Sequence, residues 1–153
     1  MSKRGLDSLE VWQVARKFAV FMCSDVLPKL PPEEKWSLTT QMRRSVQSIP
    51  SNIAEGFGRY YYQEEVRFCY IARGSLEEMY SQLCIARDLG YIDDEVFVQV
   101  VENINKLRRM LNGYIAFLKR SKRGVDEPGA HQAAREFDIN YDALAELDIK
   151  KHY

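Results

Sequence analysis

Histidine is almost missing from this chain of 153 residues, because its two histidines, His131 and His152, both lie near the C-terminal end. Di-iron helical bundles hold their metal with Glu-x-x-His pairs on facing helices, and a thiol or hydroxyl nucleophile needs a nearby base. The chain also has no Gly-rich phosphate loop and no nucleophile-elbow motif. We therefore expect a non-catalytic protein with no metal site and no cofactor.

Cysteines and long apolar runs are scarce as well. The three cysteines, Cys23, Cys69 and Cys84, are odd in number, widely spaced and flanked by apolar residues. This pattern favours reduced thiols in the core over a disulfide framework or a zinc site. No run approaches the ~18 apolar residues of a membrane-spanning helix, and the charged start of the chain lacks the apolar centre of a secretory signal. We expect a cytoplasmic protein with no membrane segment.

Four segments, by contrast, carry apolar residues at alternating spacings of three and four, the period by which helices pack in a left-handed bundle. Helix one is expected to follow an N-cap at Asp7 or Ser8 and to end at Pro28, and helix two to begin near Pro32. The remaining boundaries are Gly56 and Gly58 after helix two, Gly90 after helix three and Asp93 before helix four. The short connections predict an all-α fold, an up-down-up-down antiparallel four-helix bundle.

The side chains expected to face one another inside this bundle follow directly from the spacing. They are Trp12, Ala15, Ala19, Met22 and Val26; Leu38, Met42, Ile49, Ile53 and Phe57; Cys69, Ala72, Leu76, Met79, Leu83 and Ala86; and Phe97, Val100, Ile104, Leu107, Leu111, Tyr114 and Leu118. The adjacent acidic pairs Glu64/Glu65 and Glu77/Glu78 are expected to be solvated.

Charge is distributed unevenly, although the chain as a whole has 22 basic and 22 acidic residues. Residues 1–124 carry 19 Lys and Arg against 15 Asp and Glu, a net charge of +4, and residues 125–153 carry 3 against 7, a net charge of −4. Gly124 and the Asp-Glu-Pro-Gly run at 126–129 combine helix-stopping residues with turn residues. We expect a helical body, 1–124, and an acidic tail, 125–153, that is partly disordered or forms a short helix.

A proline lies within a helical pattern in the segment Ser45-Val-Gln-Ser-Ile-Pro-Ser-Asn-Ile-Ala-Glu-Gly-Phe-Gly-Arg59. Proline removes one backbone hydrogen bond and costs an isolated helix about 3 kcal/mol, so the fold must compensate. We expect a polar clasp in which Glu55 contacts Arg73 or Arg59 and Gly74 permits close approach of helices two and three. The clasp comprises Pro50, Asn52, Glu55, Gly56, Arg73 and Gly74; a ligand pocket and an oligomer contact are the alternatives.

Together with Leu9-Glu-Val-Trp-Gln13 and Phe68-Cys-Tyr-Ile-Ala-Arg-Gly-Ser-Leu-Glu77, this segment resembles the four-helix-bundle family of 23S ribosomal RNA intervening-sequence proteins over residues 6–121. The resemblance implies a homo-oligomeric ring, typically a pentamer. A relative of similar architecture, the accessory protein of diversity-generating retroelements, is a basic pentamer that binds a reverse transcriptase and its RNA template. Apolar residues off the main seams, which would line a ring interface or thicken the core, are Val14, Phe18, Phe21, Phe68 and Ile71.

Basic residues outside the seams suggest RNA or DNA as a partner, because clustered Lys and Arg neutralise phosphates. These residues are Arg43, Arg44, Arg59, Arg67, Lys106, Arg108, Arg109, Lys119, Arg120, Lys122 and Arg123. Ordinary solvated helix faces are the alternative, and a net charge of +4 is weak for a monomeric binder. A ring would multiply that charge.

The tail repeats apolar residues at a spacing of three, at Tyr141, Leu144 and Leu147, among acidic residues. Such a short amphipathic segment is marginal as an isolated helix, so three outcomes are open: it remains disordered, docks on its own bundle, or inserts into a partner's groove. We expect a non-catalytic oligomeric bundle that binds nucleic acid or a ribonucleoprotein partner, with a reverse-transcriptase accessory role as one form. The alternative is an interaction scaffold that displays acidic C-terminal peptides to a partner protein.

Overall fold

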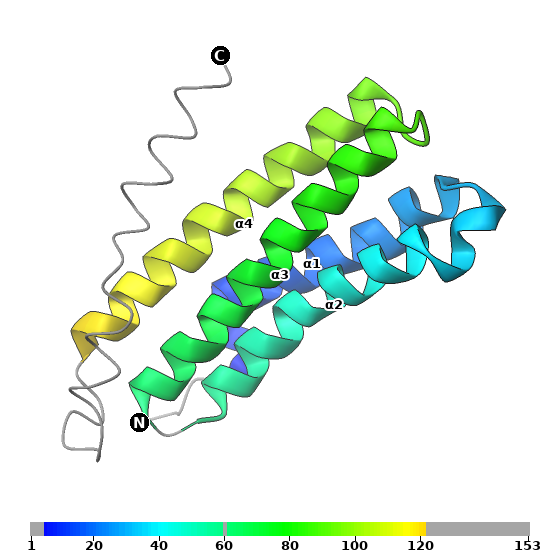
Figure 1. The fold of residues 1–153 in the computed structure, drawn as a ribbon. Helices are drawn as coiled ribbons and strands as arrows, with labels where there is room; N and C mark the ends of the chain where they lie inside the picture. The colour runs from blue at the N-terminus through cyan, green and yellow to red at the C-terminus, as the bar shows by residue number, and fades with distance from the viewer. Residues whose placement is uncertain (1–4, 60, 122–153) are drawn as a thin grey trace. The chain divides into compact units, whose positions relative to one another are not determined.

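The computed structural model describes residues 5–59 and 61–121, and every regular element in these ranges is helical. Four α-helices form the body: α1 (Glu10–Phe21), α2 (Leu38–Phe57), α3 (Tyr62–Asp88) and α4 (Asp94–Ser121). The chain reverses direction at each connection between them (Figure 1). The predicted all-α class is confirmed. The predicted tail, with Tyr141, Leu144 and Leu147, and the basic residues Lys122 and Arg123 lie outside the described residues.

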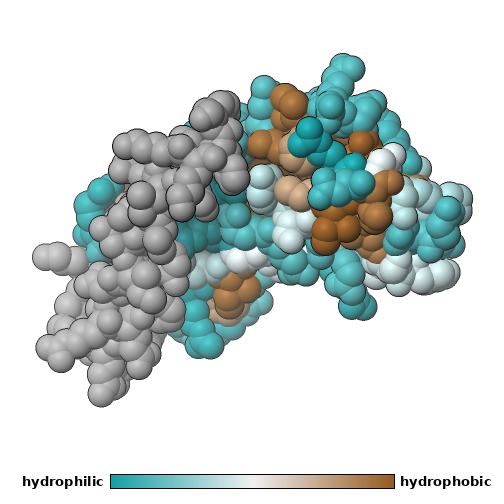
Figure 2. Space-filling model, turned by 45° about the horizontal axis from the view of Figure 1, so that its top comes forward, coloured by the Kyte–Doolittle hydropathy of each residue, from teal (hydrophilic) through white to brown (hydrophobic). Residues whose placement is uncertain are grey.

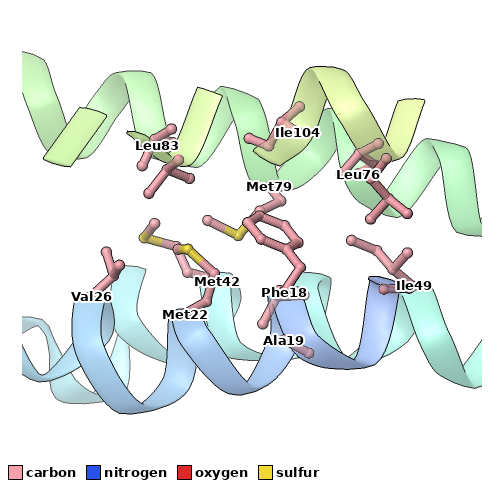
Figure 3. Close-up of a cluster of buried hydrophobic side chains, with 14 of the residues drawn as sticks. Phe18, Ala19, Met22, Val26, Met42, Ile49, Leu76, Met79, Leu83 and Ile104 are labelled. Atoms are coloured by element: carbon pink, nitrogen blue, oxygen red, sulfur yellow. The ribbon is translucent and has the colours of Figure 1, made fainter. Parts of the chain in front are cut away.

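Each helix contacts the next one along the chain, and α1 also contacts α4, so the four helices enclose a common interior. Figure 3 shows side chains from all four meeting there, including Phe18 of α1, Met42 of α2, Met79 of α3 and Ile104 of α4. These four side chains are at most 3% exposed. The most extensive contact between two elements joins α2 and α3.

Most of the predicted seam residues are buried, which confirms the helical period. The structure decides one open alternative, that for Phe18, and restricts the expectation that all three cysteines are in the core. Phe18, expected in a ring interface or a thick core, is 3% exposed and belongs to the core, while Val14 and Phe21 pack partly buried against it. Cys69 is fully buried, whereas Cys23 and Cys84 are only half-buried.

The start of α1 differs from the prediction. Asp7 and Ser8 lie in a separate 3-10 turn, Leu6–Ser8, and Leu9 precedes the helix without a side-chain cap. The Ser8 hydroxyl instead donates to the Gly5 carbonyl at 2.8 Å. After Phe21 the chain continues through a π-helical segment, Met22–Val26, and a 3-10 turn, Leu27–Lys29, that contains Pro28.

The start of α2 also differs, because Pro32–Trp36 forms a separate 3-10 turn and the α-helix begins at Leu38. The Glu34 carboxylate fixes this break: it accepts hydrogen bonds from the Ser37 hydroxyl, the Leu38 amide and, at 2.9 Å, the Tyr91 hydroxyl. These bonds hold the pKa of Glu34 below its usual value.

The end of α3 and the start of α4 agree with the prediction, which placed Gly90 after the one helix and Asp93 before the other. Gly90 has φ of +74°, the left-handed conformation that glycine adopts most readily after a helix. Asp93 then caps α4, because its Oδ1 accepts the amide of Val96 at 2.8 Å. The turn between these two residues therefore follows from local sequence alone.

Candidate functional site

The proline-containing segment forms the α2 side of a polar contact with α3. α2 remains helical on both sides of Pro50. The Asn52 amide group donates to Ser48 Oγ at 2.9 Å, and the hydroxyls of Ser48 and Ser75 share a hydrogen bond of 2.8 Å. Ser75 in turn donates to the Ile71 carbonyl at 3.2 Å. This chain of hydrogen bonds joins the two helices at their middle.

Of the two contacts predicted for Glu55, the structure contains the one with Arg59, and this pair lies at the surface. The Glu55 and Arg59 side chains are about half exposed, at 51% and 42%. Arg73 reaches in another direction and donates to Asn112 Oδ1 of α4 at 2.9 Å. The rotation of α2 about its axis explains the difference, because it turns Ser48 toward α3 and Glu55 toward solvent.

The close approach of α2 and α3 occurs at Gly56 and not at Gly74. A Cβ atom at Gly56 would lie 2.9 Å from the Phe68 Cβ and 3.1 Å from the Glu65 carbonyl oxygen. Gly74 is exposed and has no heavy atom within 4 Å of the corresponding position. Gly56 therefore brings the last turn of α2 onto the first turns of α3.

A cleft of about 390 Å³ opens at this same end of the bundle, where α2 and α4 end and α3 begins. Its lining is mostly aromatic and apolar, with one carboxylate. The lining residues are Phe57, Tyr62, Glu65, Tyr114, Phe117, Leu118 and Ser121.

Glu65 is the chemically distinctive residue of the cleft. It is 3% exposed, which overturns the expectation that the Glu64/Glu65 pair is solvated. The Tyr114 hydroxyl, brought from α4, donates to its Oε1 atom. Burial raises the pKa of the Cys69 thiol, one turn along α3, to about 12, and the negative charge of Glu65 adds to this shift. The cleft therefore combines an acceptor with apolar walls.

The other acidic pair behaves closer to expectation, because Glu77 and Glu78 are both exposed. Glu77 nevertheless has a defined partner: Arg108 of α4 forms a bidentate pair with it, at 2.6 and 2.9 Å. Arg108 also donates to Asn105 Oδ1. We conclude that Arg108, expected to bind nucleic acid, links α3 to α4.

The remaining basic residues that were predicted to bind nucleic acid differ in whether a carboxylate lies near them. Arg59 lies 5.3 Å above the Phe68 ring besides pairing with Glu55. Within residues 5–59 and 61–121, an exposed group of basic side chains has no carboxylate within 4.0 Å: Arg43, Arg44, Arg67, Lys106, Arg109, Lys119 and Arg120. The structure thus leaves these seven available to an external anion.

Basic and aromatic side chains meet at the cleft end of the bundle. Lys119 lies 5.7 Å from the centre of the Tyr70 ring, and Arg120 directly precedes the lining residue Ser121. The rings of Tyr114 and Phe117 stack at 6.2 Å with an interplanar angle of 17°, and Phe117 is 57% exposed. We call the cleft residues with Arg59, Arg67, Lys119 and Arg120 the aromatic–basic end.

Sequence reasoning missed this grouping. The signal available was Tyr62 and Tyr70, and the Tyr114/Phe117 pair at a spacing of three. Because these residues are distant in sequence, their convergence needs the antiparallel arrangement of α3 and α4. On the part of the face that is coloured in Figure 2, apolar side chains gather in separate patches between hydrophilic ones.

Two negative findings apply to the described residues. No group of three or more His, Cys, Asp and Glu side chains among them is arranged to hold a metal ion. In the same ranges, no helix has both the length and the apolar character needed to cross a membrane.

Comparison with known proteins identifies relatives of most of the helical body. One solved structure of similar fold is a protein with unknown function from the S23 ribosomal protein family of Bacteroides thetaiotaomicron VPI-5482. The two structures superpose with a TM-score of 0.64 and share 21% sequence identity. The match covers 69% of this chain and 97% of that chain. Comparison with curated proteins gives no match. The family model described as "23S rRNA-intervening sequence protein" matches residues 7–113, more than half of the chain. The chain therefore belongs to the 23S rRNA-intervening sequence protein family.

Proposed function

We propose that this protein is a non-catalytic, cytoplasmic RNA-binding protein whose up-down-up-down bundle assembles into a homo-oligomer, with the pentamer favoured. The observation that carries the proposal is the aromatic–basic end, where exposed cations adjoin an aromatic cleft. Single-stranded nucleic acids bind such surfaces because cations neutralise phosphates and aromatic rings stack on bases. The family's description, which refers to 23S rRNA, agrees with RNA as the nucleic acid.

Oligomerisation is part of the proposal for an electrostatic reason. Residues 1–124 carry a net charge of only +4, which gives one copy a weak attraction for a polyanion. A ring would repeat the aromatic–basic end once per subunit and place several cations along one RNA strand. A ribonucleoprotein setting, including association with a reverse transcriptase, is compatible with this arrangement.

The test is an RNA titration with variants matched in charge. We expect Arg67→Ala/Arg120→Ala to weaken binding of a labelled single-stranded RNA and to reduce the slope of log K against log salt by about 0.7 per lost phosphate contact. Fluorescence anisotropy at several salt concentrations measures both quantities.

Arg43→Ala/Arg44→Ala is the matched control, because it removes the same charge about 20 Å along α2 from Phe57. Equal weakening by the two double variants would show that net charge, not the aromatic–basic end, determines binding. Absence of salt-sensitive RNA binding by the unmodified protein would overturn the proposal and favour the scaffold alternative.

A further inference from the structure

The basic residues of α4 are not confined to its C-terminal end. Lys106, Arg109, Gly113, Phe117 and Arg120 follow one another at spacings of three, four, four and three, so they lie on one face of the helix. All five are exposed. We call these five residues the α4 track, which joins the aromatic–basic end at Phe117 and Arg120.

We propose that a single strand of RNA binds along the α4 track, with phosphates on its three cations and a base stacked on Phe117. The inference rests on the proposed function, because it gives the RNA-binding surface a path and a length. From Lys106 to Arg120 the helix rises about 21 Å. A stacked strand advances about 3.4 Å per nucleotide, so the track corresponds to about six nucleotides.

The charge of α4 is concentrated in its second part, because residues 103–121 include five basic residues and no acidic one. A helix dipole favours cations only in about the last turn of a helix. It therefore does not account for Lys106 and Arg109, which lie more than three turns before the end of α4 at Ser121.

The bundle does not use these two charges either. Arg108, which lies between them in sequence, pairs with Glu77 of α3 at 2.6 Å. Lys106 and Arg109 are exposed, and no carboxylate of the described residues lies within 4.0 Å of either. Their charges are therefore available to the phosphates of a bound strand.

Gly113 leaves the middle of the track open. Apart from the backbone of α4 itself, no heavy atom of the described residues lies within 4 Å of the position that a Cβ would occupy there. Glycine weakens a helix interior relative to alanine, and the packing of this bundle does not require it at that position. A strand that approaches the helix closely accounts for it.

The aromatic residue of the track favours a single strand over a duplex. Phe117 is 57% exposed and is separated from Arg120 by three positions, so its ring lies beside a cation. Bases stack on such a ring when they are free of a pairing partner. Cations and a ring along one line thus match a strand whose phosphates and bases are both accessible.

The first experiment compares labelled adenosine RNAs of four and eight nucleotides, which span about 14 and 27 Å when stacked. Only the longer RNA can occupy the whole track. We expect Lys106→Gln/Arg109→Gln to weaken binding of the eight-nucleotide RNA by about 10- to 30-fold, and that of the four-nucleotide RNA by less than about twofold. Fluorescence anisotropy measures both affinities.

Arg43→Gln/Arg44→Gln is the matched control, because it removes the same charge from α2. It should weaken either RNA by less than about twofold. Equal weakening of the long RNA by the two double variants, or equal weakening of both RNAs by Lys106→Gln/Arg109→Gln, would overturn the inference.

A second experiment varies charge at the open middle of the track. Gly113→Glu, Gly113→Gln and Gly113→Lys introduce side chains of similar size, and circular dichroism verifies that each variant folds. The dissociation constant for the eight-nucleotide RNA should fall about three- to tenfold at each step from Glu to Gln to Lys.

Gln47→Glu and Gln47→Lys make the same charge changes at an exposed residue of α2 and should alter the dissociation constant by less than about twofold. Equal effects at positions 47 and 113 would overturn the track while leaving salt-sensitive RNA binding, and hence the proposed function, intact. An unmodified protein that binds neither RNA in a salt-sensitive manner overturns this inference together with the proposed function.

Discussion

Gly56 is the residue at which the smallest change should have a large structural effect. Its missing side chain lets the α2 backbone lie against Glu65 and Phe68 of α3. A methyl group there would overlap the α3 backbone, which has little freedom to move. Overpacking of this kind costs about 1–3 kcal/mol, while Gly→Ala in a helix regains at most about 1 kcal/mol.

We therefore expect Gly56→Ala to lower the free energy of unfolding by about 1–2 kcal/mol, measured by urea titration. Gly58→Ala is the control, because its Cβ would lie in ordinary contact, 3.5 Å from the Glu55 carbonyl. It should leave stability almost unchanged. A Gly56→Ala protein as stable as the unmodified one would show that α2 and α3 can separate at this point without cost.

Helices α2 and α3 are joined by hydroxyl groups at the middle of their contact. Ser48 and Ser75 share a 2.8 Å hydrogen bond, and Ser75 is 9% exposed. Neutral hydrogen bonds of this kind contribute about 0.5–1.5 kcal/mol. A double-mutant cycle with Ser48→Ala and Ser75→Ala should give a coupling free energy in that range. Ser51→Ala, an exposed serine on the same helix that bonds only within α2, is the control and should not couple to Ser75→Ala.

The helices and most of their buried faces were predictable from sequence, because the three-and-four spacing records which side of each helix is apolar. The interior positions Met42, Leu76 and Leu107 are all fully buried as expected. The polar contacts were less predictable. A rotation of α2 by a fraction of a turn decides whether Glu55 or Ser48 faces α3, and spacing alone does not fix that rotation.

The candidate site was the least predictable part for a related reason. Adjacent carboxylates such as Glu64 and Glu65 normally remain in water. Glu65 is buried because Tyr114, 49 positions later, supplies a hydroxyl donor. No local pattern in the sequence encodes that pairing. The basic residues were identified by type, but the partners of Arg108 and Arg73 lie 31 and 39 positions away, on the opposite helix of the α3–α4 pair.

At the scale of the whole molecule, two exposed apolar residues of α3 and Leu89, which directly follows that helix, are the basis of a prediction about self-association. Ile71, Ile85 and Leu89 are 44%, 48% and 54% exposed, and the helical period places Ile71 and Ile85 on one face of α3, with Leu89 one turn beyond Ile85. We expect light scattering to give a mass five times 17.9 kDa. Ile71→Glu/Ile85→Glu should reduce that mass, because it would bury charge at the interface.

Val20→Glu is the control for this double variant, since Val20 is an exposed apolar residue of α1. It should leave the mass unchanged. A wild-type protein that elutes as a single 17.9 kDa species at micromolar concentration would contradict the pentamer.

The order in which the helices touch has a consequence for how the chain folds. Contacts between α1 and α2, α2 and α3, and α3 and α4 each join neighbours in sequence, so each hairpin closes only a short loop. The contact between α1 and α4 joins opposite ends of the described body and requires the others to be in place. Chains dominated by such local contacts fold in microseconds to milliseconds. Docking of α1 onto α4 should accordingly be the last step of folding and the first to open in hydrogen exchange.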